Sequence, residues 1–169
     1  MKNKTLKLIL AGASLALFVV AILMFLVSFL DQVTSGVLNG TKSLFTGFEI
    51  FSTDALDANY KLGTIFAFAF VVLGALSACY AVAYVLLGKK SKKSKGNKNA
   101  KLLCALCTFV LVALVPAILL FLTKQTTGVA LDVHAGVFGG TETKLGVGAV
   151  LAAVFSLVGG CALSLEEVL

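Results

Sequence analysis

Four long apolar blocks, separated by polar segments, dominate the pattern along the chain. None contains Asp, Glu, Lys, Arg or His, and each meets the roughly 20-residue length that a helix needs to cross about 30 Å of hydrocarbon. The apolar runs are unbroken rather than alternating, which argues against membrane-spanning strands. We therefore predict four transmembrane helices, at residues 8–30, 62–87, 102–123 and 145–165.

The composition agrees with a single all-α membrane domain covering residues 1–169. Hydrophobic residues make up 59% of the chain and charged residues 13%, with a mean hydropathy of +1.04; a soluble globule of this size could not cover so much apolar surface. The first block is too long for a cleavable signal sequence, so we expect a retained helix. The connections are then outer loops at 31–61 and 124–144 and a basic loop at 88–101.

Lysines are distributed unequally between the two sides of this layout. Ten lie near the N-terminus or in the basic loop, and four lie in the outer loops. Because short lysine-rich loops remain cytoplasmic, we expect a plasma-membrane protein with both termini inside. The basic loop also predicts contact with anionic lipid headgroups, worth about 1 kcal/mol per lysine, or it serves orientation alone. No aromatic residue interleaves its lysines, so no nucleic-acid partner is expected; the headgroup candidates are Lys89, Lys90, Lys92, Lys93 and Lys95.

The two halves of the chain resemble each other. Lys2-Asn3 aligns with Lys98-Asn99, and Lys61-Leu62-Gly63 aligns with Lys144-Leu145-Gly146. Each half would be a helical hairpin that enters from the cytoplasm. This internal repeat predicts a four-helix bundle of two parallel hairpins, related by a pseudo-twofold axis along the membrane normal.

Small residues at four-residue intervals predict where helices approach closely, because lipid supplies no hydrophobic drive between helices. They pack either within one bundle or against a second copy or another membrane protein. The third block contains Pro116, which we expect to bend its helix. The predicted packing residues are Gly148, Ala152, Ser156 and Gly160 in the fourth block and Gly63 and Ala67 in the second.

Alternating residues in the outer loops predict two short strands, one at 129–134 and one at Phe48–Ile50. Paired above the bundle, they would form a small extracellular β cap. In layout the chain resembles the four-span proteins of the claudin and peripheral-myelin type, which have a longer first outer loop with strands. It lacks the tryptophan and the outer-loop cysteine pair of those proteins, so the resemblance carries over no residue and no function.

Four cysteines are the sharpest chemical candidates: Cys79, Cys104, Cys107 and Cys161. Together they could bind a soft metal or sense redox state, yet thiols buried in lipid ionise poorly and pack as small apolar groups. The second reading is favoured, so no metal or cofactor is predicted. His134, Asp132 and Glu142 form a weaker outer constellation, for which a solvated loop is favoured.

No hydrolase, phosphate-loop or metalloprotease motif occurs, and we predict that the protein is not an enzyme. The spans also lack the ionisable residues typical of ion-coupled transporters. We therefore expect a structural, assembly or accessory membrane component acting through helix packing and its extracellular loops. The alternative is an oligomeric channel or passive transporter for a small solute, lined by hydroxyls at Ser14, Thr64, Ser77, Thr108 or Ser156.

Overall fold

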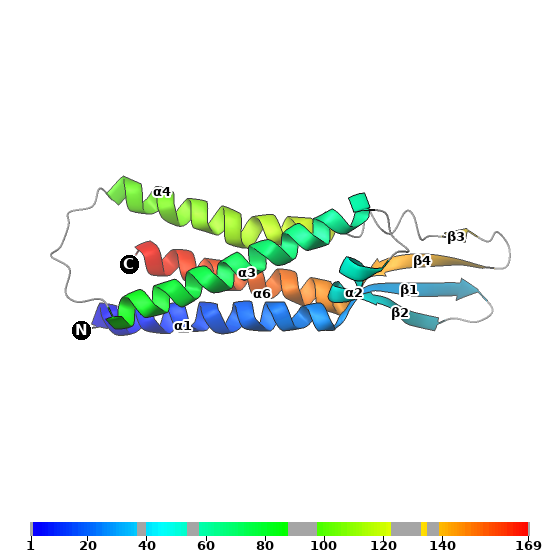
Figure 1. Ribbon diagram of the computed structural model, residues 1–169, viewed down its shortest axis with the longest axis horizontal. Helices are drawn as coiled ribbons and strands as arrows, with labels where there is room; N and C mark the ends of the chain where they lie inside the picture. The colour runs from blue at the N-terminus through cyan, green and yellow to red at the C-terminus, as the bar shows by residue number, and fades with distance from the viewer. Residues whose placement is uncertain are drawn as a thin grey trace.

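A computed structural model contains four helices that are long and apolar enough to cross a membrane, with a sheet projecting from one end of their bundle (Figure 1). The four predicted helices are thus confirmed at Lys4–Leu26, Lys61–Leu87, Lys101–Leu122 and Val147–Val168. Both termini lie at the opposite end from the sheet, and we call these the terminal end and the sheet end. The structure describes residues 2–36, 40–53, 58–87, 98–122, 133–134 and 139–168.

Two of the helix boundaries differ from the predicted ones because strands adjoin the helices directly. Helix α1 (Lys2–Leu23) passes through a 3₁₀ turn (Met24–Leu26) into β1 (Ser28–Gly36). The first span was predicted to reach residue 30, which is wrong: Phe29 and Leu30 are fully buried strand residues. Likewise Leu145 ends a strand, and α6 (Val147–Val168) begins after it and continues beyond residue 165.

The second and third long helices are α3 (Ala58–Leu87) and α4 (Lys98–Phe109), the latter continued by a π-helical segment (Val110–Leu114) and by helical residues 115–122. In the π segment the Val115 N–H donates to the Val110 carbonyl, five residues back. Pro116 follows at once. A proline inside a helix clashes with the carbonyl four residues before it, so this wide turn lies where the irregularity was expected.

The sheet has three main strands and a two-residue fourth, in the order β2-β1-β4-β3, all antiparallel. The other strands are β2 (Gly40–Thr46), β3 (Val133–His134) and β4 (Gly139–Leu145). A sheet was expected here, but β1, β2 and β4 were not the strands predicted. Of the predicted strand at 129–134, only Val133 and His134 lie within the described residues, and these two form β3.

The other predicted strand, Phe48–Ile50, is wrong because these residues belong to helix α2 (Gly47–Ser52). A capping box begins that helix. The Thr46 hydroxyl accepts from the Glu49 N–H at 3.3 Å, and the Glu49 carboxylate accepts from the Thr46 N–H at 2.8 Å. These two bonds satisfy donors that the first turn of a helix otherwise leaves without a partner.

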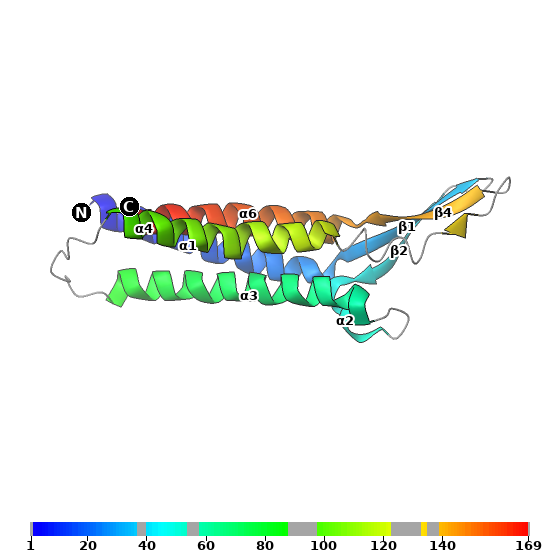
Figure 2. The same ribbon diagram turned by 90° about the horizontal axis from the view of Figure 1, so that it is seen from above.

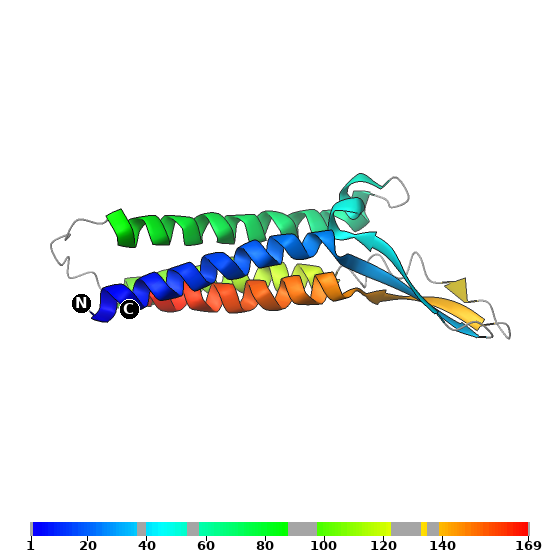
Figure 3. The ribbon, with the colours of Figure 1, turned by 90° about the horizontal axis from the view of Figure 1, so that it is seen from below.

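Helix α6 occupies the centre of the bundle and is the most buried of the four long helices. It packs against α1 on one side and α4 on the other, while α3 packs mainly on α1. Figures 1, 2 and 3 agree that α3 comes close to α4 at the sheet end and diverges from it toward the terminal end. At the junction with the sheet, Phe25 lies 4.6–6.3 Å, centroid to centroid, from four other rings: Phe29, Phe48, Phe51 and Phe68.

The predicted internal repeat is not confirmed. The aligned tripeptides have different structures: Lys61-Leu62-Gly63 lies within α3, whereas Lys144 and Leu145 are strand residues of β4. In the first half a strand, α2 and then a helix follow one another, while in the second half β4 leads directly into α6. The alignment therefore does not pair structurally equivalent positions at this point.

Candidate functional site

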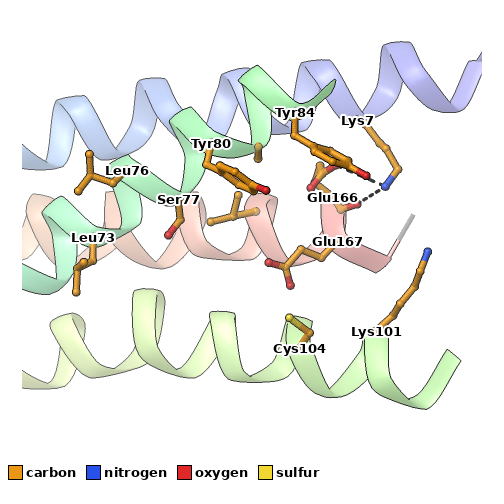
Figure 4. A pocket seen from close by; sticks show the side chains of 12 residues that line it. Lys7, Leu73, Leu76, Ser77, Tyr80, Tyr84, Lys101, Cys104, Glu166 and Glu167 are labelled. Atoms are coloured by element: carbon orange, nitrogen blue, oxygen red, sulfur yellow. Dashed lines mark hydrogen bonds and ion pairs between the residues drawn. The ribbon is translucent and has the colours of Figure 1, made fainter. Parts of the chain in front are cut away.

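A groove of about 860 Å³ opens between α3, α4 and α6 near the terminal end, where α3 and α4 diverge (Figure 4). We call it the α3–α4 groove. One wall is formed by large side chains of α3, which face outward because α3 packs on α1 instead. Leu73 is 51% exposed and Leu76 61%. The groove is therefore accessible from the side of the bundle, at the level of the surrounding lipid if the helices span a membrane.

Charged side chains cluster at the terminal end of this groove. Lys7 of α1 reaches across to α6, where its Nζ lies 3.5 Å from Glu166 Oε1 and donates to the Glu166 backbone carbonyl at 3.0 Å. Glu166 is only 8% exposed, so its carboxylate depends on this partner for compensation. The ion pair links the first and the last of the four long helices.

A second polar contact joins α4 to α6 beside the first. The Thr108 hydroxyl donates to the Glu167 carboxylate, with oxygen–oxygen distances of 3.0 and 3.2 Å. Lys101, one turn before Cys104 on α4, also lines the groove. Among the described residues, Lys101 is in neither of the two ion pairs. Within the described part of the chain, the opposite charges of Lys101 and Glu167 therefore lie on facing helices and in neither ion pair.

Two tyrosines of α3 complete the groove. Tyr80 and Tyr84 are one helical turn apart, their rings stack at 6.3 Å with an interplanar angle of 24°, and both are exposed. In Figure 4 their hydroxyl ends point toward the part of the groove that carries Lys7 and Glu166. Such rings, apolar in the body and polar at the tip, are typical of the boundary between hydrocarbon and water.

Toward the middle of α3 and α4 the groove adjoins a smaller, apolar cavity of about 280 Å³, which we call the inner cavity and which exposed residues such as Leu111 line. The two share Leu73, Ser77 and Cys104 in their walls. Phe70 and Leu111 line the inner cavity from opposite helices. The groove thus runs from charged residues near the terminal end to apolar residues near the middle of α3 and α4.

Most of the predicted packing residues are buried between helices of the same chain. Gly148, Ala152, Ser156 and Gly160 are all buried, as is Ala67, while Gly63 is half-buried. A Cβ on Gly148 would lie 2.8 Å from the backbone oxygens of Met24 and Ser28, and one on Gly160 would lie 2.5 Å from the Cβ of Ala113. Backbones approach so closely at Gly148 that no larger residue fits there.

The hydroxyls considered as pore lining do not face one common lumen. Ser14 donates to the Gly159 carbonyl at 2.8 Å, and Ser156 donates to the Ala153 carbonyl at 2.9 Å; both are fully buried, as is Thr64. Ser77 lines the α3–α4 groove instead, and Thr108 lines its inner cavity. Ser14 and Ser156 thus play the usual role of serine in a helical bundle, which is to donate a hydrogen bond to a helix carbonyl.

The four cysteines are free and exposed, and they are not gathered into one site. Cys104 and Cys107 line the groove region, whereas Cys79 and Cys161 do not. Within the described part of the chain, no group of three or more His, Cys, Asp or Glu side chains could hold a metal. The five basic-loop lysines and Asp132 lie outside the described residues; His134 is in β3, and exposed Glu142 lies 3.9 Å from Lys144.

Sequence reasoning missed the groove because it placed Lys7, Lys101, Glu166 and Glu167 beyond the ends of the spans. Each of these residues is instead helical and faces a neighbouring helix. One signal was available. Glu166 and Glu167 follow the fourth apolar block without any turn residue, so the helix could have been extended through them.

The chain matches no protein-family model, no curated protein and no solved structure. The sheet and the groove must therefore be interpreted from their own geometry.

Proposed function

We propose that the protein is a non-enzymatic, multi-pass component of the plasma membrane that contacts another protein through an outer sheet held rigidly by the bundle. The observation that carries this proposal is the direct continuity between sheet and helices. Only Val27 separates the 3₁₀ turn that follows α1 from β1, and only Gly146 separates β4 from α6.

The junction between sheet and bundle is too tight for a hinge. The Gly146 N–H donates to the Phe29 carbonyl at 2.8 Å, and a Cβ on Gly146 would overlap the backbone of Ser28. The phenylalanine cluster around Phe25 fills the space beneath. A sheet fixed in this way keeps its orientation relative to the membrane, so little entropy would be lost when a partner binds.

The sheet also offers a free edge to a partner. Strand β2 pairs only with β1 and leaves its other side without a neighbouring strand among the described residues. Its first four residues, from Gly40 to Ser43, are exposed. Unpaired backbone groups on such an edge can pair with a strand of another protein. A charged side chain such as Lys42 on the edge opposes unselective pairing with other strands. The alternative, an oligomeric channel or passive transporter, has less support, because Ser14 and Ser156 are bonded inside the core of one chain and cannot line a lumen between copies.

Site-specific photocrosslinking in native membranes tests the proposal. A crosslinking side chain at Thr41 or Lys42 should give a discrete adduct with one protein. The matched control is Val19 on the outer face of α1, which is 46% exposed and should label lipid alone. An adduct at Val19 with none at Thr41 and Lys42 would place the contact in the membrane and refute the proposal, as would the absence of adducts at all three positions.

A further inference from the structure

We propose that the α3–α4 groove binds a protonated amphipathic amine, a molecule with a single ammonium group on an apolar alkyl or aryl body. The ammonium would lie against the carboxylate of Glu167, and the apolar body would extend into the inner cavity. This inference does not depend on the contact function of the sheet.

The carboxylate of Glu167 lies deeper in the bundle than the other free charge of the groove, on Lys101. It accepts from the Thr108 hydroxyl at 3.0 and 3.2 Å, and Thr108 follows Lys101 on α4 by about two turns, or about 10 Å along the helix axis. Glu167 also belongs to the candidate span Val147–Val168. Within a membrane, an ionisable side chain at such a depth is costly without a compensating partner and typically marks a binding site.

Within the described part of the chain, no cation compensates this carboxylate. Lys7 is paired with Glu166 at 3.5 Å, and Glu167 is in neither of the two ion pairs. Figure 4 shows the Lys101 ammonium nearer to the terminal end than the Glu167 carboxylate. The donor that Glu167 does have, the Thr108 hydroxyl, is neutral. The carboxylate therefore keeps lone pairs that the N–H groups of an external ammonium can fill.

The order of the charges from the terminal end inward selects the ligand. Lys101 comes first, Glu167 lies deeper, and apolar residues of the inner cavity such as Phe70 and Leu111 follow. An amphipathic amine whose body points inward presents its only charge to Glu167 and keeps it away from Lys101. A phospholipid or a fatty acid in the same pose would bring its phosphate or carboxylate against Glu167, which repels it. The outer ammonium of a diamine would meet Lys101, so the groove also discriminates against a second positive charge.

The walls of the groove suit an ammonium with an apolar body. Tyr80 and Tyr84 line it with exposed, stacked rings, and the face of an aromatic ring attracts a cation. Ser77 lines both the groove and the inner cavity, and its hydroxyl can accept from an N–H group. The groove volume of about 860 Å³ falls within the roughly 300–1,000 Å³ of small-molecule sites.

Equilibrium binding to the full chain in phosphatidylcholine nanodiscs tests the proposal, with binding to empty nanodiscs subtracted. The probes are phenylbutylamine, phenylbutanol and phenylbutyrate, which share one apolar body and differ in the head group. We expect the amine to bind saturably, one molecule per chain, and several-fold more tightly than the alcohol or the acid. Absence of saturable amine binding, equal affinity for the three probes, or tighter binding of the acid would overturn the proposal. Loss of amine binding when phosphatidylethanolamine is added to the nanodiscs would show that a phospholipid occupies the groove, and would also overturn it.

Charge substitutions separate this site from a general attraction of amines to the chain. Glu167→Gln keeps an oxygen that can accept from Thr108, and the affinity for phenylbutylamine should fall about tenfold or more. The matched control is Glu142→Gln at the sheet end, where the side chain is 61% exposed, and it should leave the affinity unchanged. Lys101→Gln removes a like charge and should raise the affinity about twofold. Equal losses in the two glutamate variants, or a tenfold loss in Lys101→Gln, would refute the proposed order of charges.

Thiol protection locates the ligand without altering Glu167. One variant keeps only Cys104, which lines the groove, and its control keeps only Cys79, which is exposed and outside both cavities; the other cysteines are replaced by alanine. Saturating phenylbutylamine should slow the reaction of Cys104 with N-ethylmaleimide several-fold and leave the reaction of Cys79 unchanged. An unchanged rate at Cys104, or equal slowing at both thiols, would contradict the proposal.

Discussion

The α1–α6 interface and the α3–α4 side of the bundle have similar apolar composition but opposite packing. Across the first interface, Gly148 sits against the backbone at the end of α1, and Ser14 bonds directly to the Gly159 carbonyl. Across the second, α3 presents Leu73, Leu76 and two tyrosines to a groove of about 860 Å³. Side-chain size decides between the two outcomes, because small residues let helix backbones approach closely, whereas large residues hold them apart.

Ionisable groups follow the same division. In the groove, the space between the helices holds charged side chains near the helix ends, among them Lys7, Lys101 and Glu167. In the middle of the closely packed α1–α6 interface the described polar groups are hydroxyls whose hydrogen bonds end on backbone carbonyls, and the Lys7–Glu166 pair crosses this interface only at the terminal end. Close packing between α1 and α6 thus stabilises the fold, whereas loose packing between α3 and α4 leaves the groove open.

The largest difference between the two sides should come from Gly148→Leu, in the closely packed interface. The new side chain would meet backbone carbonyl oxygens of Met24, Val27 and Ser28, which cannot move as a flexible side chain can. We expect destabilisation at or beyond the upper end of the about 1–3 kcal/mol typical of overpacking. Thermal unfolding followed by size-exclusion chromatography in detergent measures it.

The control for this substitution is Val158→Leu on the same helix, at a residue that is 50% exposed. It should change stability by less than about 0.5 kcal/mol. If the two variants unfold at the same temperature, close approach at Gly148 does not hold α6 against α1.

A smaller effect is expected from the Lys7–Glu166 pair. Lys7→Met leaves the nearly buried carboxylate of Glu166 without its cation and should cost about 1–3 kcal/mol. The loss should fall below that of a fully buried pair because the Lys7 side chain is 27% exposed. The double variant Lys7→Met with Glu166→Leu should recover much of the stability, since no unpaired charge remains.

A double-mutant cycle on these substitutions isolates the interaction between the two residues. Chemical denaturation in detergent gives the four free energies of unfolding. Additive losses, with no recovery in the double variant, would mean that the ion pair does not couple α1 to α6.

The smallest effect is expected from serine-to-alanine substitutions, one on each side of the bundle. Ser14→Ala removes the hydrogen bond to Gly159 and should cost about 0.6 kcal/mol, up to about 1.7. Ser77→Ala, at an exposed position in the groove wall, should leave the free energy of unfolding unchanged. A larger loss at Ser77 than at Ser14 would reverse the assignment of the tight and the loose side.

Hydropathy predicted the four helices because length and apolarity are enough to identify a span. It could not separate the end of α1 from β1, since Phe29 and Leu30 are buried in a strand and equally apolar. The Thr46 and Glu49 pair matches the sequence pattern of a capping box, which predicts the start of a helix. The alternation at Phe48–Ile50 led instead to the prediction of a strand. The groove depends on how α3 and α4 diverge, and no local pattern encodes that.

The pairing of β1 with β4 has a consequence for the order in which the protein can be made. Leu30 is opposite Leu145 in the sheet, and the same distant parts of the chain meet again where Lys7 contacts Glu166. During synthesis β1 can form its hairpin with β2 early, but its other edge must wait until β4 has been made, after α3 and α4. Such long-range pairing is slow and leaves a strand edge exposed in the meantime. The nascent chain is therefore most vulnerable to aggregation between the synthesis of β1 and that of β4, an interval in which a chaperone would have most to protect.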